Sequence, residues 1–261
     1  MRTPRKGLIA ALAAVLALLT ACGGSGGDGQ GVLRVGTLSD SPPNIYQENG
    51  NYTGFDNELL RAIAAKQGLQ LEFVSTDFSA LLGRVSSGQF DIGSSAIAQT
   101  PARKETVDFS DPYNFQSLSI EVKEPSPITD ENSLAGKRIG VVQGTASDGW
   151  LTATAPAAQA VRFPNDAAAL TALKSGSVDG SVFDQATAEQ YVASNPDVKL
   201  KVAKSFTTDT PHGFAVKKGN TELANKINEG LKQVIADGTW ERLHQQFMPT
   251  APVPDQFRAN G

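Results

Sequence analysis

The sequence contains very little cysteine and histidine, with one Cys and two His among 261 residues. A single cysteine cannot form a disulfide within the chain, and it cannot supply a cysteine-rich zinc or iron–sulfur site. The two histidines, His212 and His244, are too few and too far apart in the sequence to indicate a histidine-based metal centre. We therefore expect no metal and no cofactor.

The chain also lacks an excess of basic residues. It has 23 Lys plus Arg against 27 Asp plus Glu, and its pI is about 5.3. The basic residues are scattered singly or in pairs, which argues against a protein that binds nucleic acid by neutralising phosphates. With 40% hydrophobic and 19% charged residues, the chain can build a sizeable core as one large domain or two modest ones.

Residues 1–21 have the organisation of a secretory signal peptide. Three basic residues precede an apolar run from Leu8 to Leu19, which is followed by small residues and then by Cys22. The run is much shorter than the roughly 20 residues that cross a bilayer as a helix. The quartet Leu19-Thr20-Ala21-Cys22 resembles the lipobox of bacterial lipoproteins, in which the cysteine is acylated and the chain is cut just before it. The alternative is that Cys22 is an incidental small residue near an ordinary cleavage site.

A glycine-rich segment follows the cysteine. Residues 23–31 read Gly-Gly-Ser-Gly-Gly-Asp-Gly-Gln-Gly, a composition typical of a flexible tether. We interpret residues 22–31 as a lipidated cysteine and its tether. Lipid chains would then hold the protein to a membrane.

From residue 32 onwards, short apolar runs alternate with amphipathic stretches. Asp56 has the character of a helix N-cap, and Gly68 occupies a helix-terminating position. This alternation predicts repeated βαβ units and a mostly parallel sheet. The first half is expected to contain strands at 33–36, 69–73 and 91–94, and helices at about 57–67 and 78–87.

One pattern occurs twice in the chain. The segment from Leu82 to Asp91 reappears 88 residues later, from Leu170 to Asp179, each time as a helix, a glycine stop and a short strand. The repetition suggests two similar α/β lobes. Because ligands of open α/β sheets bind beyond the carboxyl ends of strands, the residues after the repeated strands deserve inspection, namely Ser95-Ala96 and Phe183-Asp184.

Charged residues near these strand ends could hold an α-amino acid. Thr100 and Pro101 predict a helix start that places Arg103 in the first turn, where its guanidinium could bind a carboxylate through two hydrogen bonds. Asp184 could accept hydrogen bonds from an ammonium group. The alternatives are a surface or ion-paired arginine and an aspartate that merely caps the following helix.

Two further features could complete such a site. The turn Gln143-Gly144-Thr145-Ala146, between a strand at 138–142 and a helix, could direct backbone N–H groups at an anion, or it could be an ordinary strand-to-helix turn. Phe78 could lie against the carbon chain of a ligand, or it could belong to the core. Together these residues would bind both charges of an amino acid from different halves of the chain.

Several motifs resemble those of the extracellular solute-binding proteins of family 3, the substrate receptors of polar amino-acid ABC importers. The resemblance spans about residues 32 to 248, and nine motifs in order carry it. They are 33–37 (LRVGT), 42–43 (PP), 54–56 (GFD), 87–91 (SGQFD), 100–103 (TPAR), 107–113 (VDFSDPY), 136–141 (GKRIGV), 144–145 (GT) and 237–239 (DGT).

The resemblance implies an α/β fold that forms a two-lobed clamshell of the type II periplasmic-binding-protein kind. Lobe 1 would comprise residues 32–119 and 215–248, and lobe 2 residues 120–214. Two hinge strands would join them near Ser117 to Val122 and Gly213 to Val216. Residues 249–261, beyond the resemblance, are a proline-rich tail that we expect to be dispensable for binding.

The resemblance also implies roles for individual residues. Arg103 would bind the ligand α-carboxylate, helped by Thr145 and by the amides around Ala96 and Ala98. Asp184 and Ser95 would bind the α-ammonium group, and Phe78 would pack on the side chain.

The sequence departs from the family pattern around the ligand side chain. Ser41 occupies the position after the first strand at which relatives commonly have an aromatic residue, and Ala98 occupies a position at which they often have Thr or Ser. Positions that can be polar in relatives are Val142 and Phe183. We therefore expect a pocket that is less polar toward the ligand side chain than in receptors for basic amino acids.

By this resemblance the protein is a receptor and not an enzyme. It would be a lipid-anchored monomer on the extracytoplasmic face of the cell membrane that captures an amino acid and delivers it to an ABC permease with a separate ATPase. The chain has no P-loop motif, so hydrolysis would occur in that partner. The alternatives are a dehydratase-like enzyme on the same clamshell and an amino-acid sensor that does not transport.

Overall fold

The computed structural model describes residues 31–259, which contain two five-stranded sheets and one small three-stranded sheet. The predicted signal peptide, Cys22 and most of the tether lie outside the described residues. The first half of the described chain contains β1 (Leu33–Thr37), β2 (Asp40–Ser41), β3 (Ile45–Glu48), β4 (Asn51–Thr53), α1 (Phe55–Gln67), β5 (Leu71–Ser75), α2 (Phe78–Ser86), β6 (Ile92–Ser94), α3 (Pro101–Thr106), β7 (Val107–Phe109) and β8 (Asn114–Lys123).

The second half contains η1 (Glu131–Leu134), β9 (Arg138–Val142), α4 (Ala146–Thr154), β10 (Gln159–Phe163), α5 (Asp166–Ser175), β11 (Gly180–Asp184), α6 (Gln185–Ser194), η2 (Pro196–Val198), β12 (Leu200–His212), β13 (Ala215–Lys217), α7 (Thr221–Ala236), α8 (Thr239–Phe247) and η3 (Asp255–Phe257). The strands expected at 33–36, 91–94 and 138–142 and the helix at 78–87 are thus confirmed to within two residues. The strand expected at 69–73 begins two residues later.

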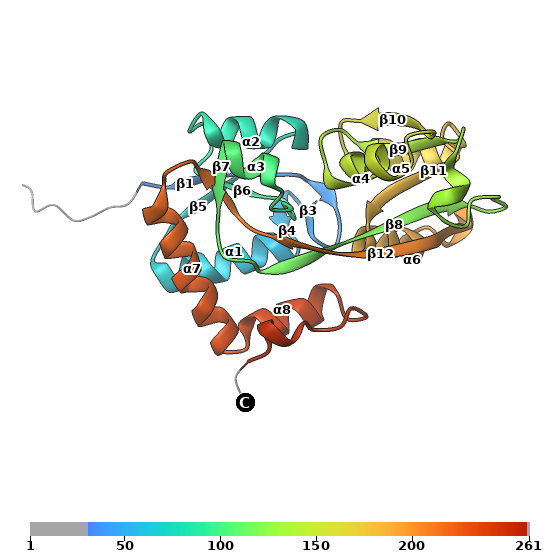
Figure 1. Cartoon of the computed structure of the whole chain (residues 1–261). Helices are drawn as coiled ribbons and strands as arrows, with labels where there is room; N and C mark the ends of the chain where they lie inside the picture. Colours follow the sequence, from blue (N-terminus) through green and yellow to red (C-terminus); the bar gives the residue numbers. More distant parts are fainter. Residues whose placement is uncertain (1–30, 260–261) are drawn as a thin grey trace, which may run out of the picture. The chain divides into compact units, whose positions relative to one another are not determined.

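The two large sheets define the two lobes of an α/β clamshell (Figure 1). The strand order is β5-β1-β6-β13-β7 in the first sheet and β10-β9-β11-β8-β12 in the second. β1 pairs in parallel with β5 and β6, and β9 pairs in parallel with β10 and β11, as the βαβ pattern predicts. The expectation of a mostly parallel sheet is wrong, however, because β13 pairs antiparallel with β6 and β7, and β8 pairs antiparallel with β11 and β12. These strands enter their sheets from the crossings between the lobes and not through βαβ units. The small sheet β2-β3-β4 belongs to the loop that follows β1.

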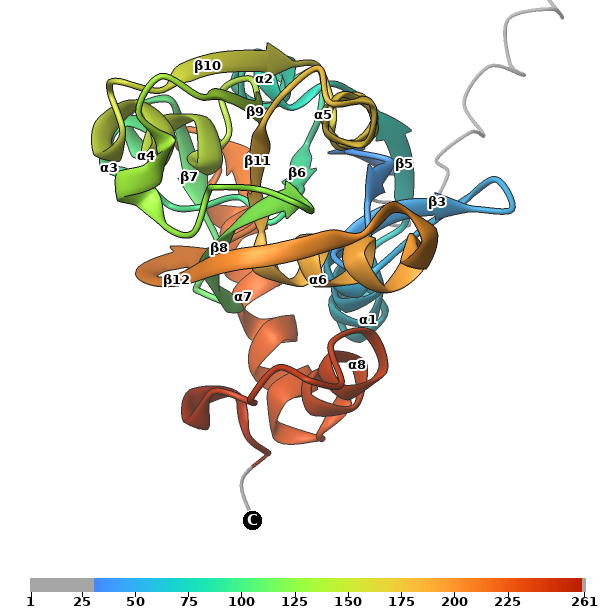
Figure 2. The same cartoon turned by 90° about the vertical axis from the view of Figure 1, so that its right-hand side faces the viewer.

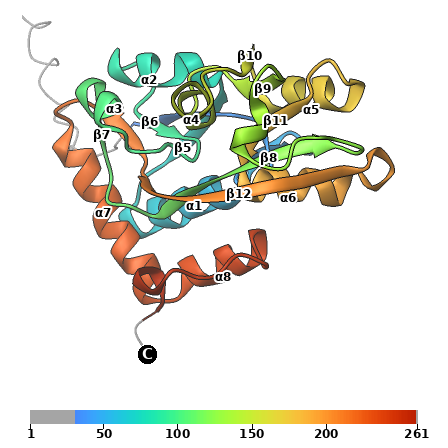
Figure 3. The ribbon, with the colours of Figure 1, turned by 45° about the vertical axis from the view of Figure 1, so that its right-hand side comes forward.

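Helices cover both faces of each sheet. In lobe 1, α1, α7 and α8 enclose one apolar core around Phe55 and Trp240, and α2 covers the other face around Leu81 and Phe90. Figures 1, 2 and 3 show α7 and α8 away from α2. In lobe 2, α4 packs on one side of the sheet, and α5 and α6 pack on the other. No helix within residues 31–259 is long and apolar enough to cross a membrane.

The repeat detected in the sequence corresponds to equivalent structures in the two lobes. Asp91 accepts a 2.8 Å hydrogen bond from the backbone N–H of Arg34, and its own N–H donates to the Arg34 carbonyl. Asp179 makes the same pair of contacts with Arg138. The aspartate of the repeat therefore ties its turn to β1 in lobe 1 and to β9 in lobe 2.

Two long antiparallel strands connect the lobes. β8 and β12 pair from Leu200 opposite Lys123 to His212 opposite Asn114, and Figure 3 shows these two strands of the second sheet side by side, reaching toward lobe 1. β8 belongs wholly to the second sheet, so the lobe boundary expected after residue 119 falls inside a strand. The chain crosses between sheets after β7 and again between β12 and β13.

The N-cap predicted at Asp56 is wrong, because Gly54 occupies that position in α1. Gly54 has φ 105°, and a Cβ there would overlap the carbonyl oxygen of Asn44. The buried Asp56 carboxylate instead accepts hydrogen bonds from the Tyr113 hydroxyl (2.6 Å) and the Ala96 N–H (2.5 Å). Its partners are distant in sequence, so local capping rules could not identify them.

Candidate functional site

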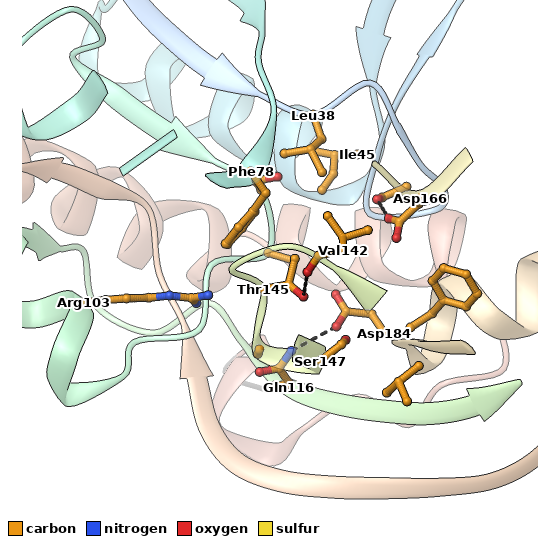
Figure 4. Close-up of a pocket in the computed structure, with 16 residues that line it drawn as sticks. Leu38, Ile45, Phe78, Arg103, Gln116, Val142, Thr145, Ser147, Asp166 and Asp184 are labelled. Atoms are coloured by element: carbon orange, nitrogen blue, oxygen red, sulfur yellow. Dashed lines mark hydrogen bonds between the residues drawn. The ribbon is translucent and has the colours of Figure 1, made fainter. Parts of the chain in front are cut away.

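A cavity of about 40 Å³ lies between the two lobes, at the carboxyl ends of their strands. Six of the seven residues predicted to bind ligand line it: Phe78, Ser95, Ala96, Arg103, Thr145 and Asp184. Figure 4 shows Arg103 entering from one side, with Asp184 across the cavity from it. The structure thus brings together residues that are up to 106 positions apart in the sequence.

The local sequence positions Arg103 as predicted. Thr100 is the N-cap of α3 and accepts a 3.3 Å hydrogen bond from the Arg103 N–H, and Pro101 is the first helical residue. The guanidinium lies 5.0 Å from the centroid of the Phe78 ring. Burial lowers the pKa of Arg103 to about 10, and the charge of Asp184 opposes that shift. Arg103 therefore stays protonated at neutral pH.

Ala98 does not line the cavity. Its side chain is fully buried, and its carbonyl oxygen accepts a 2.9 Å hydrogen bond from Nη1 of Arg103. The Ala96 N–H, which we expected near the ligand carboxylate, donates to Asp56. The Ala96 N–H and the Ala98 carbonyl therefore already have hydrogen-bond partners within the protein in this structure.

Asp184 ends β11 and precedes α6, but its side chain makes no capping hydrogen bond to that helix. Its Oδ1 accepts a 3.0 Å hydrogen bond from Nε2 of Gln116 on β8. Burial raises the pKa of Asp184 to about 6, while the Gln116 hydrogen bond and the charge of Arg103 lower it. The carboxylate is therefore held in the cavity and is not engaged in capping α6.

The turn after β9 presents the start of α4 to the cavity. Thr145 is the N-cap of this helix, accepting from the Asp148 N–H, and its hydroxyl donates to the Val142 carbonyl at 2.7 Å. The Gly144 N–H donates to Asp148 and is not free. Ala146 and Ser147, the first helical residues, also line the cavity. The first N–H groups of a helix have no partner within it, so they can donate to an anion.

Ser95 contributes an unpaired polar group. Its side chain is 3% exposed, and its Oγ has no hydrogen-bond partner among the described residues. A buried hydroxyl without a partner costs free energy. A polar ligand group in the cavity would remove that cost.

Sequence reasoning missed three polar residues of the cavity, Gln116, Ser147 and Asp166. Gln116 lies on β8 and carries no motif. Asp166 begins α5, directly after β10, so the strand-end rule applied to this strand would have found it. We expected the part of the pocket that faces the ligand side chain to be weakly polar. That expectation did not take into account the carboxyl group of Asp166, which lines the cavity.

Hydrogen bonds join the lobes around the cavity. Nη2 of Arg103 donates to the Gly144 carbonyl at 3.0 Å, and the Ser41 hydroxyl donates to Asp166. Asp40 also links the lobes, because its carboxylate accepts from the Ala167 N–H at 2.8 Å and its carbonyl accepts from the Tyr191 hydroxyl at 2.7 Å. The structure therefore represents a closed arrangement of the lobes.

Comparison with known proteins places these features in a family. The family model described as bacterial extracellular solute-binding proteins, family 3, matches residues 33–250. A "Probable histidine-binding protein" from Campylobacter jejuni is 32% identical over 220 residues, which cover 82% of this chain and 84% of that protein.

Solved structures agree with the fold. "An ancestral arginine-binding protein bound to arginine" is 37% identical, with a TM-score of 0.81, and the match covers 84% of this chain and 99% of that one. An ancestral amino-acid-binding protein described as a precursor of cyclohexadienyl dehydratase is 36% identical, with a TM-score of 0.75 and coverage of 83% and 95%.

Proposed function

The chain belongs to the bacterial extracellular solute-binding proteins of family 3, and we propose that it captures an amino acid outside the cytoplasm for an ABC importer. One observation carries this proposal. Arg103 of lobe 1 and Asp184 of lobe 2 line the same cavity, with opposite charges. They match the two charges of an α-amino acid zwitterion.

Each part of such a ligand has a suitable partner. The guanidinium of Arg103 and the first N–H groups of α4 would bind the α-carboxylate. Asp184 and the unpaired Ser95 hydroxyl would bind the α-ammonium group. Phe78 would pack against the carbon chain. A ligand held in this way bridges both lobes.

Ligand entry requires the lobes to separate. The closed cavity of about 40 Å³ is far below the roughly 300–1,000 Å³ of typical ligand pockets. A ligand that contacts both lobes favours the closed state because the open state offers only half of its contacts. We expect small-angle scattering to show compaction when a saturating ligand is added, and an unchanged radius of gyration would contradict the bridging geometry.

The ligand can be identified by a thermal-shift screen of the 20 common amino acids on the full chain. A ligand at about 100 times its Kd stabilises the native state by about 2.7 kcal/mol. The same screen on Arg103→Ala should give much less stabilisation at the same ligand concentration. If no amino acid stabilises the unsubstituted protein, the proposed function is wrong.

The sequence supports attachment of this receptor to the cell membrane through an acylated Cys22. We propose that the acyl chains and the tether hold the receptor near its permease and ATPase. Cys22→Ala should release the protein from membranes or leave it unprocessed. Mass spectrometry that finds no acyl group on Cys22 of the mature protein would contradict this anchor.

An enzyme on the same fold is the second candidate, because one similar structure is an ancestral amino-acid-binding protein described as a precursor of a dehydratase. The two functions differ in a simple assay. Incubation with prephenate should leave the substrate unchanged if the protein is a receptor. Product formation would favour the enzyme.

A further inference from the structure

The cavity contains one more negative group than a zwitterion needs. Among the described residues that line it, Arg103 is the one cation, and Asp184 and Asp166 are both acidic. The carboxylate of an amino acid would pair with Arg103, and its ammonium group with Asp184. Asp166 would then have no charged partner from the backbone part of the ligand.

Asp166 lies where a ligand side chain would end. Figure 4 shows Arg103 and Asp166 at opposite sides of the cavity, with Asp184 between them. The walls in this region are apolar, and methylene groups can pack against them. The apolar residues are Leu38, Ile45, Phe78 and Val142.

A second observation shows independently that the cavity is built for a polar ligand. Ser95 Oγ is buried and has no hydrogen-bond partner among the described residues, although it lines the same cavity. The acidic groups do not form a metal site instead, because no group of three His, Cys, Asp or Glu side chains within residues 31–259 is arranged to hold an ion. A cationic group on an organic ligand would supply the charged partner that Asp166 lacks.

Closure of the lobes brings a second carboxyl group next to Asp166. Asp40 of lobe 1 accepts a hydrogen bond from the N–H of Ala167, the residue that follows Asp166 in lobe 2. Burial raises the pKa of Asp166 well above its ordinary value, and the negative charges of Asp40 and Asp184 raise it further. The neighbouring carboxyl groups therefore disfavour the ionised form of Asp166 in the closed state, and a cation beside it would favour that form.

Resting on the proposed amino-acid receptor function, we propose that Asp166 binds a positively charged ligand side chain and thereby selects a cationic amino acid over its neutral isosteres. The Ser41 hydroxyl, which donates to Asp166, orients the carboxylate from the opposite lobe. The cation would interact with Asp166 and Asp40 only when the lobes are closed. Its charge would thus add to the driving force for closure.

This selectivity predicts the release of a proton on binding. Three titratable groups face Asp166 besides Arg103: Asp40 from β2, Asp184 from β11 and Tyr191 from α6. Burial and the neighbouring carboxyl groups disfavour the ionised form of Asp166, and a cation favours it, so a cationic ligand should displace protons from this carboxyl group. A neutral ligand should release fewer.

The test compares ligands that differ in charge but little in shape. Calorimetric titration of the full chain would use L-arginine against L-citrulline, and L-lysine against L-norleucine. Of arginine and lysine, the one that binds more tightly should have a Kd at least about tenfold lower than the Kd of its neutral isostere. Repeating the titration in buffers of different ionisation enthalpy would count the released protons.

Asp166→Asn keeps the shape of the side chain but removes its charge. This variant should lose the preference for the cation and its excess proton release, while binding of the neutral isostere stays within about threefold of the unsubstituted protein. Asp197→Asn, at an exposed position of η2, is the matched control and should keep both properties.

The outcomes separate this inference from the proposed function. If neutral isosteres or glutamine bind as tightly as the cations, or if Asp166→Asn keeps the preference, the inference is wrong and the receptor function stands. If no amino acid binds the unsubstituted protein, the receptor function fails and the inference fails with it.

Discussion

The guanidinium of Arg103 in lobe 1 donates a 3.0 Å hydrogen bond from Nη2 to the carbonyl oxygen of Gly144 in lobe 2. Its other terminal nitrogen donates to the Ala98 carbonyl. Both acceptors are neutral. A ligand carboxylate is a stronger acceptor for a guanidinium, and it can take two parallel hydrogen bonds. The group that closes the lobes in this structure is therefore the same group that would bind the ligand.

Replacement of Arg103 should weaken ligand binding strongly. Arg103→Ala leaves the α-carboxylate buried without a cation, which costs on the order of 2–5 kcal/mol, or at least about thirtyfold in Kd. Arg103→Lys should also bind poorly, because an ammonium group cannot make the two-pronged contact. Calorimetric titration with the best ligand from the thermal-shift screen measures both effects.

Lys104→Ala is the control for this experiment, since Lys104 is the exposed neighbour of Arg103 on the same helix. Its affinity should match that of the unsubstituted protein. If Arg103→Ala is folded and binds the ligand with unchanged affinity, Arg103 does not receive the carboxylate.

Ligand affinity should fall at acidic pH because of Asp184. Burial raises the pKa of this carboxyl group to about 6. Above pH 6 the carboxylate is ionised and attracts the ligand ammonium, and below pH 6 it is increasingly protonated. The Kd should therefore rise as pH falls from 7 to 5, approaching about tenfold per pH unit below the pKa.

Asp184→Asn separates this effect from other titrations. The variant should bind the ligand weakly. Its Kd should not show the steep rise below pH 6 that we expect for the unsubstituted protein. The difference between the two pH profiles is the measurement that matters, because Asp56, whose pKa burial raises to about 7, is present in both proteins. Parallel profiles would remove Asp184 from the ammonium site.

Sequence reasoning worked where the determinants are local. The Thr100 cap and Pro101 placed Arg103 in the first turn of α3, because capping depends on neighbours within four residues. It failed at Asp56, whose partners Ala96 and Tyr113 are 40 and 57 residues away. Asp166 was missed for a different reason. The strand that precedes it, β10, was not among the strands predicted from the sequence, so the strand-end rule was not applied there.

Glu121 should make stability depend on pH. Its side chain is fully buried in β8, and neither carboxylate oxygen has a hydrogen-bond partner among the described residues. Burial raises the pKa of Glu121 from 4.5 to about 8. The folded state thus holds a proton that the unfolded state loses above pH 4.5. The contribution of Glu121 to the free energy of unfolding is complete below pH 4.5 and is lost as pH rises to about 8.

Glu121→Gln removes this titration. Between pH 5 and 8 the unsubstituted protein should lose a few kcal/mol that the variant does not lose, as measured by urea unfolding at each pH. Glu105→Gln, at an exposed position, should keep the pH dependence of the unsubstituted protein. Identical slopes for Glu121→Gln and the unsubstituted protein would show that Glu121 is not the titrating group.

The C-terminal segment contributes to the core of lobe 1 more than its proline-rich sequence suggests. Phe257 is 4% exposed, and its ring stacks on Trp240 with a centroid distance of 4.8 Å and lies 6.0 Å from Phe115 on β8. It does not line the ligand cavity. The prediction that residues 249–261 are dispensable therefore applies to ligand binding and cannot be extended to stability.

Phe257→Ala tests this distinction. Loss of a buried aromatic ring should lower the free energy of unfolding by about 3 kcal/mol or more, because it leaves a cavity beside Trp240. Gln256→Ala, at the exposed neighbouring position, should have little effect. Ligand affinity, measured well below the melting temperature of the variant, should be unchanged. An affinity that falls while the protein remains folded would mean that the contact of Phe257 with Phe115 on β8 influences the closure of the lobes.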